Sequence, residues 1–126
     1  MKISQLDHIV LTVGDIDATV AFYCSVLGMT PEIFGEGRVA LKFGQQKINL
    51  HLYGNEFEPK ADKPMPGAVD LCLITETPLE QAMLEVKSKG ILIEEGPVTR
   101  TGATGPILSF YIRDLDNNLI EIANYQ

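Results

Sequence analysis

Two stretches of the sequence decide the fold: LDHIVLTVGDIDATVAFYCSVLG at residues 6–28 and AVDLCLITETPLEQAMLEVKSKG at residues 68–90. In each, a polar residue opens a strand-like run, a polar turn follows, and an amphipathic helical pattern ends at a glycine. A shift of 62 residues places His8 on Asp70. Self-similarity at a fixed spacing predicts that the chain contains the same structural unit twice.

Both helical patterns carry start and stop signals. The first helix is predicted to begin near Asp15. In the second, Thr77 is the predicted N-cap, Pro78 suits the first helical position, and Glu80 completes a capping box. Gly90 is expected to take the left-handed conformation that ends this helix. These signals bound the two helices without help from the rest of the chain.

Three strand-like segments are predicted after each helix, at 30–34, 38–43 and 47–53 in the first half and at 91–94, 107–113 and 118–124 in the second. The last strands, KINLHLY and NLIEIAN, align when His51 meets Glu121, a shift of 70. The shift grows by eight residues, and the glycine- and threonine-rich stretch GPVTRTGATG (96–105) is predicted to hold the extra residues as an insertion.

The predicted fold class is therefore α+β, with two tandem βαβββ modules forming a curved mixed sheet. The modules span 1–54 and 68–126, and a proline-containing linker, 55–67, joins them within a single domain, 1–126.

Composition narrows the function. Seventeen acids against ten bases give a formal charge of −7, which argues against nucleic-acid binding. No apolar run approaches the length of a membrane span, and the N-terminal residues do not have the pattern of a signal peptide. Cys24 and Cys72 lie in apolar patterns and are predicted to be buried thiols in a reducing compartment. The expected location is therefore the cytoplasm.

Strand alternation places four metal-competent side chains on matching faces. In each of four predicted strands, one face is aliphatic and the other holds His8, His51, Asp70 or Glu121. Two imidazoles and two carboxylates suit a borderline divalent cation, which predicts a metal site. The alternative for each histidine is a hydrogen-bonded structural role, and Asp70 can instead cap the end of a strand.

The residues also resemble a known family. The opening segment and the closing RDLDNNLIEIANY resemble the vicinal oxygen chelate superfamily, also called the glyoxalase, bleomycin resistance and extradiol dioxygenase superfamily. Further segments resemble its subgroup of glyoxalase domain-containing protein 5 and bacterial virulence-associated relatives. The resemblance implies that His8 and Glu121 are metal ligands. It places Asp70 where histidine is common and His51 near a position where glyoxalases have glutamate.

The resemblance also implies a reaction class. Superfamily enzymes chelate vicinal oxygens of a small substrate on a divalent metal, here Ni, Co, Mn, Fe or Zn, and Glu121 is the expected catalytic base. Arg100, Thr101 and Thr104 are the candidates to bind an anionic or oxygenated substrate. Tyr53 either donates a hydrogen bond to a bound oxygen or packs in the core. A glyoxalase-type lyase or isomerase and a dioxygenase both remain open.

A second reading from the same family is a non-catalytic binding protein of the bleomycin-resistance type. Such clefts are normally lined by aromatic residues, whereas this chain has no tryptophan and retains the ligand-type side chains. For either function we expect a small-molecule ligand and a homodimer, with neither nucleic acid nor membrane as a partner. The site is then either within one chain or shared across the dimer.

Overall fold

The computed structural model describes all residues, 1–126, and divides into an N-terminal unit, Met1–Ala68, and a C-terminal unit, Val69–Gln126. None of the helices is long and apolar enough to span a membrane.

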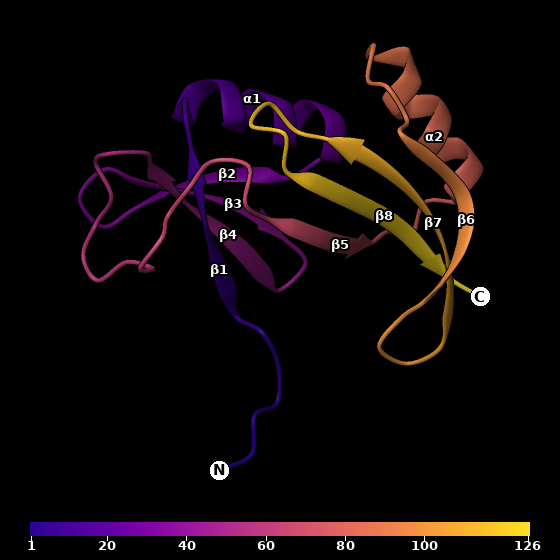
Figure 1. The fold of residues 1–126 in the computed structure, drawn as a ribbon, viewed down its shortest axis with the longest axis horizontal. Helices are drawn as coiled ribbons and strands as arrows, with labels where there is room; N and C mark the ends of the chain where they lie inside the picture. Colours follow the sequence, from indigo (N-terminus) through magenta and orange to yellow (C-terminus); the bar gives the residue numbers. More distant parts are fainter. The chain divides into compact units, whose positions relative to one another are not determined.

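The N-terminal unit is a four-stranded mixed sheet with one helix on one face (Figure 1). The strand order is β1-β4-β3-β2; β1 and β4 are parallel, and the other neighbours are antiparallel. The elements are β1 (His8–Val13), α1 (Ile16–Leu27), β2 (Thr30–Phe34), β3 (Arg38–Phe43) and β4 (Gln46–Leu52).

The C-terminal unit repeats this topology, with strand order β5-β8-β7-β6 and a parallel β5–β8 pair. The elements are β5 (Asp70–Ile74), α2 (Leu79–Ser88), β6 (Glu95–Thr101), β7 (Pro106–Arg113) and β8 (Leu119–Tyr125). The predicted α+β class and the two βαβββ modules are therefore confirmed, as two four-stranded sheets.

The first helix follows its sequence signals. The Asp15 carboxylate accepts a hydrogen bond from the Ala18 N–H at 2.9 Å, as an N-cap residue does. Gly28 ends the helix with φ +68°, and its N–H donates to the Cys24 carbonyl.

The second helix departs from the prediction at its start. Thr77 does not cap it; the N-cap is Pro78, which makes no side-chain capping bond. Instead the Asn124 side chain, on β8, accepts a hydrogen bond from the Leu79 N–H at 2.8 Å. Asn124 also donates to the carbonyls of Thr75 and Thr77. A side chain 45 residues away supplies the cap, so the local pattern does not reveal it.

The predicted strand at 91–94 is wrong. That segment is irregular, and the strand is β6, which takes up much of the stretch predicted as an insertion, 96–105. Val98 pairs with Ser109 and Thr101 with Pro106, so these residues form regular antiparallel pairs with β7. Glycine is depleted in strands, but here pairing with β7 outweighs that local preference.

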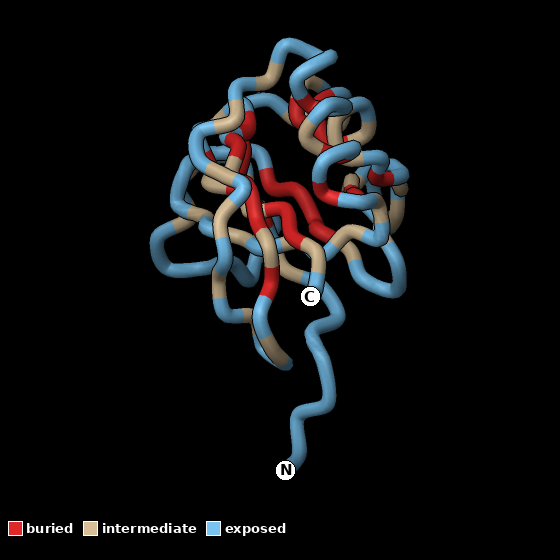
Figure 2. Tube along the Cα trace, turned by 90° about the vertical axis from the view of Figure 1, so that its right-hand side faces the viewer, coloured by how far each residue is buried: buried red, intermediate tan, exposed pale blue.

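Each sheet has one face buried under its helix, as the alternation of the sequence predicts. Figure 2 shows the buried positions gathered on strands and helices, with the N-terminal residues exposed. In both units the side chains with the lowest exposure are mainly aliphatic and aromatic: Leu11, Val13, Tyr23, Leu41, Ile48 and Leu50 in one, and Phe110, Ile112, Ile120, Ile122 and Val86 in the other. The opposite face of each sheet carries the candidate site residues.

Candidate functional site

Glu121 lies on β8, on the sheet face opposite the helix-covered side. Its Oε2 atom accepts a hydrogen bond of 2.6 Å from the hydroxyl of Ser109, a fully buried residue on the neighbouring strand. Tyr111 pairs with Glu121 from β7 and Cys72 pairs with it from β5. The carboxylate is half-buried and is held by the Ser109 hydroxyl from β7.

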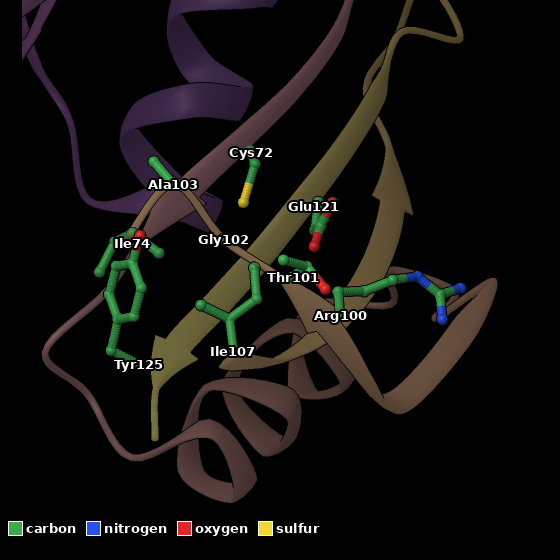
Figure 3. A pocket seen from close by; sticks show the side chains of 9 residues that line it. All are labelled: Cys72, Ile74, Arg100, Thr101, Gly102, Ala103, Ile107, Glu121 and Tyr125. Atoms are coloured by element: carbon green, nitrogen blue, oxygen red, sulfur yellow. The ribbon is translucent and has the colours of Figure 1, made fainter. Parts of the chain in front are cut away.

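A cavity of about 390 Å³ opens beside Glu121 within the C-terminal unit. Figure 3 shows the side chains of Cys72, Ile74, Ile107 and Tyr125 gathered on the same side as the Glu121 carboxylate. The cavity joins apolar walls to one carboxylate and a few polar groups, as small-molecule sites typically do.

The Cys72 thiol is not a buried residue as predicted, because the residue is exposed. Partial desolvation, together with the adjacent Glu121 carboxylate, raises the pKa of Cys72 to about 11. The thiol is therefore protonated at neutral pH and is a poor nucleophile there.

Only some of the predicted substrate-binding residues line the cavity. Arg100 and Thr101 line the cavity, whereas Thr104 lies in the following turn, where its N–H donates to the Tyr125 hydroxyl at 3.2 Å. The Arg100 guanidinium extends away from the Cys72 side of the cavity (Figure 3) and donates to the Tyr111 hydroxyl at 2.9 Å. Its pKa is raised, chiefly by that hydrogen bond.

In the N-terminal unit, His8 opens β1 and is exposed. Its Nδ1 lies 2.8 Å from an Asp7 carboxylate oxygen. A carboxylate on one imidazole nitrogen leaves the other nitrogen as the electron-pair donor, the arrangement common to metal-binding histidines. His8 therefore keeps Nε2 available on the exposed side of the strand.

The side chains of His8 and His51 lie on the same face of the sheet but at different positions along the strands. His8 pairs with Lys47, whereas His51 pairs with Thr12, four residues further along β1. At a rise of about 3.3 Å per residue, this offset is roughly 13 Å. Asn49, two residues before His51 on the same face, lies nearer to His8.

The register also corrects the alignment of the two halves. His8 pairs with Lys47 and Asp70 pairs with Leu119, so the residue two positions beyond each partner is Asn49 in one unit and Glu121 in the other. Asn49, not His51, is thus equivalent to Glu121, a shift of 72. Asn49 is buried and its Oδ1 atom has no hydrogen-bond partner. The sequence alone does not point to Asn49, because an asparagine in a strand is not by itself a sign of metal binding.

His51 occupies a different environment. It is 3 % exposed, and its ring meets Phe57 edge-on at 5.7 Å. Burial, and then the positive charge of Arg38, lower the pKa of His51, so the ring is neutral at pH 7. A guanidinium nearby opposes a bound cation as well as a protonated ring. Tyr53, predicted to face the substrate, is exposed just beyond the end of β4.

Within either unit, no three histidine, cysteine, aspartate or glutamate side chains are clustered as a metal site. The N-terminal unit offers the His8 imidazole and the orphaned Asn49 oxygen, and the C-terminal unit offers the carboxylates of Asp70 and Glu121. Nitrogen and oxygen donors of these kinds are the ones that borderline divalent ions take in proteins.

The chain is similar to known proteins over its whole length. It is 57% identical over 125 residues to virulence protein STM3117 of Salmonella typhimurium, covering 99% of this chain and 87% of that protein. It is 53% identical over 126 residues to glyoxalase domain-containing protein RDO1 of Mycosarcoma maydis, covering 100% and 71%. An integron cassette protein from the V. cholerae mobile metagenome has 60% identity, a TM-score of 0.98, and coverage of 100% and 98%.

More distant structures share the fold alone. A lactoylglutathione lyase from Agrobacterium tumefaciens has 23% identity and a TM-score of 0.75, covering 98% of this chain and 96% of that one. The antibiotic-binding protein TnmS3 from Streptomyces has 18% identity and a TM-score of 0.77, covering 100% and 99%. The same fold therefore serves an enzyme and a binding protein.

The family model described as the Glyoxalase/Bleomycin resistance protein/Dioxygenase superfamily matches residues 5–122. Together with the paired βαβββ modules, this match establishes that the chain belongs to that superfamily.

Proposed function

We propose that this protein is a divalent-metal-dependent enzyme that acts on a small oxygenated substrate, with Glu121 as its central residue. The observation that carries the proposal is the fixed Glu121 carboxylate, bonded to a fully buried serine and opening onto a cavity in the same unit. A carboxylate held this way is suited to binding a metal ion or moving a proton. The superfamily match supports the same chemistry.

Two residues in each unit are proposed to bind a metal ion: His8 and Asn49 in the N-terminal unit, and Asp70 and Glu121 in the C-terminal unit. The equal register of the two pairs supports this set. It replaces the His51 of the sequence analysis with Asn49, because His51 faces the Arg38 charge. When bound, the ion would supply Lewis-acid stabilisation of a developing oxyanion.

The surrounding side chains have distinct tasks in this proposal. Ser109 holds the Glu121 carboxylate, so the orientation of its oxygens is fixed before substrate binds. Ile107, which is buried, supplies part of the apolar wall of the cavity, and the Thr101 hydroxyl would bind a substrate oxygen. Arg100 is then a positioning residue, since its guanidinium is engaged by Tyr111 and Glu95.

Both reaction types of the superfamily, a lyase or isomerase and a dioxygenase, are compatible with this donor set. We propose the lyase or isomerase reading, because a fixed carboxylate beside an apolar cavity suits proton transfer next to a carbonyl. The homodimer belongs to the proposal too. Large apolar residues, among them Val10 and Ile74, are exposed on the candidate faces and suit an interface.

Calorimetry tests the proposal. Chelator-treated protein titrated with Mn²⁺, and separately with Ni²⁺, should bind about one ion per chain. Glu121→Gln should weaken binding at least tenfold, whereas Glu85→Gln on the exposed side of α2 should leave it unchanged. Absence of binding by either ion, with folded protein by circular dichroism, would overturn the enzyme reading. The non-catalytic binding function would then be the better candidate.

A further inference from the structure

Tyr125 is the aromatic residue that lines the Glu121 cavity, and it is the last residue of β8. It follows Glu121 by four residues, so both side chains lie on the same face of the strand. Figure 3 shows its ring pointing back from the end of the strand, with the hydroxyl on the side of Ala103. The hydroxyl is therefore a polar group on the wall of the cavity.

The turn between β6 and β7 fixes the Tyr125 hydroxyl in place. The Thr104 N–H donates to the hydroxyl oxygen at 3.2 Å, and the Gly102 N–H closes the turn by donating to the Gly105 carbonyl at 2.8 Å. A Cβ atom on Gly102 would lie 2.8 Å from the hydroxyl oxygen and 2.9 Å from the Ile107 Cγ2 atom. The turn thus packs directly against the hydroxyl and leaves no room for a side chain between them.

These contacts determine where the hydroxyl proton points. A tyrosine hydroxyl can accept hydrogen bonds and has one proton to donate. The side chain of Thr104, and then its N–H, hydrogen-bond to the oxygen and lower the pKa of Tyr125. Because an N–H can only donate, the hydroxyl proton points away from it and remains available to a ligand. Accepting a hydrogen bond also strengthens the one that the hydroxyl donates, since linked hydrogen bonds polarise one another.

The charged groups of the cavity disfavour an anionic ligand. Arg100 and Glu121 are the charged residues that line it. The Arg100 guanidinium extends away from the Cys72 side of the cavity (Figure 3) and donates to the Tyr111 hydroxyl and to a Glu95 carboxylate oxygen. The Glu121 carboxylate is then the charge that a ligand meets, and it repels another anion. An uncharged carbonyl oxygen can accept a hydrogen bond from the hydroxyl without that cost.

We propose that Tyr125 is the specificity-determining residue of this cavity, where its hydroxyl donates a hydrogen bond to the carbonyl oxygen of an uncharged ketone or aldehyde. The apolar part of the ligand lies against Ile107. This inference rests on the proposed function, because it takes the Glu121 cavity as the substrate site, but it does not require a bound metal. Tyr53, the candidate donor from the sequence, is not among the residues that line this cavity.

Nuclear magnetic resonance on the full chain, kept in chelator and labelled with ¹³C at the tyrosine Cζ atoms, tests the proposal. The probes are cyclohexanone, cyclohexene, which lacks the acceptor oxygen, and cyclohexanecarboxylate, which adds a negative charge. Cyclohexanone should shift the Cζ signal of Tyr125 in a saturable way. It should bind about fivefold more tightly than cyclohexene, the ratio that one neutral hydrogen bond provides. Cyclohexanecarboxylate should bind more weakly than cyclohexanone.

Tyr125→Phe keeps the ring and removes the hydroxyl, so this variant should bind the two uncharged probes equally. Tyr53→Phe is the matched control and should retain the preference for cyclohexanone. The Cζ signal is read in the wild-type chain, so the test does not depend on the folding of a variant.

Three results would overturn the proposal: equal binding of cyclohexanone and cyclohexene by the wild-type chain, no saturable shift of the Tyr125 Cζ signal, or tighter binding of the carboxylate. The Mn²⁺ and Ni²⁺ titrations described above succeed or fail independently of these results. Failure of the metal-dependent function and failure of the role of Tyr125 are therefore distinguishable.

Discussion

Asn49 and Glu121 occupy equivalent positions in their sheets. In each sheet, the first residue of the first strand pairs with a residue of the parallel neighbouring strand, and Asn49 or Glu121 lies two residues beyond that partner. The duplicated unit thus presents an amide in one half and a carboxylate in the other. The carboxylate bonds to Ser109, whereas the Oδ1 atom of Asn49 has no partner. This relationship distinguishes Asn49 from His51 as the counterpart of Glu121.

The hydrogen bond between Ser109 and Glu121 predicts that Ser109→Ala weakens metal binding. The serine is fully buried, and without its hydroxyl the carboxylate loses a fixed orientation. We expect roughly a tenfold loss of Mn²⁺ affinity and a destabilisation of about 1–3 kcal/mol. Calorimetry and urea denaturation measure the two effects. Ser4→Ala, at an exposed position before β1, is the matched control, and equal affinities for the two variants would refute the role of Ser109.

The Asn124 side chain makes the contacts that begin α2, so Asn124→Ala should be costly. Three hydrogen bonds are lost, one of them to the first N–H of the helix. We expect the free energy of unfolding to fall by about 2–3 kcal/mol in urea denaturation. Asn55→Ala, at an exposed position after β4, should change it by less than about 0.5 kcal/mol. A comparable loss in both variants would show that the capping role is not the cause.

Two departures of the structure from the sequence prediction share one physical reason. The Asn124 cap and strand β6 both depend on contacts between segments distant in the sequence. Local patterns predicted the helices, their glycine ends and the alternation of faces, because these depend on neighbours along the chain. The register of two parallel strands depends on the whole module. Aligning the apolar residues of the two last strands gave an equivalence that differs by two residues from the one in the observed strand pairing.

In the candidate site, too, local patterns predicted some features, and contacts between distant segments determine the others. Glu121 was predicted correctly to lie on the sheet face opposite the core, and Arg100 and Thr101 do line the adjacent cavity. The contacts of Ser109 and Asn49 were missed, because a serine and an asparagine within strands have many ordinary roles. Whether His8 and Glu121 bind one ion stays a prediction.

Gly96 predicts a strong backbone effect at the start of β6. A methyl group there would meet the Phe110 Cα at 2.7 Å, and φ is +121°. Gly96→Ala should therefore lower stability by more than about 3 kcal/mol, since both the clash and the dihedral oppose it. Gly37→Ala has a positive φ but open space around it, so its loss should be about 1 kcal/mol. Thermal and urea denaturation of the two variants provide the comparison, and similar losses would contradict the packing argument.

The raised pKa of Cys72 predicts slow alkylation despite exposure. With a pKa of about 11, roughly one thiol in a thousand is ionised at pH 8, so the rate should keep rising up to about pH 11. Glu121→Gln removes the adjacent negative charge and should shift the profile to lower pH. Iodoacetamide labelling followed by peptide mass spectrometry gives the rate at Cys72. A profile that levels off near pH 8.5 in the wild-type protein would contradict this account.

Paramagnetic broadening by Mn²⁺ tests the central claim most directly, because it locates the ion as well as detecting it. With one equivalent of Mn²⁺, the amide signals of Asp70 and Glu121 should broaden first within the C-terminal unit, and Glu121→Gln should abolish the effect. Broadening confined to the acidic surface of α2, or none at stoichiometric Mn²⁺, would contradict a metal centre built on Glu121.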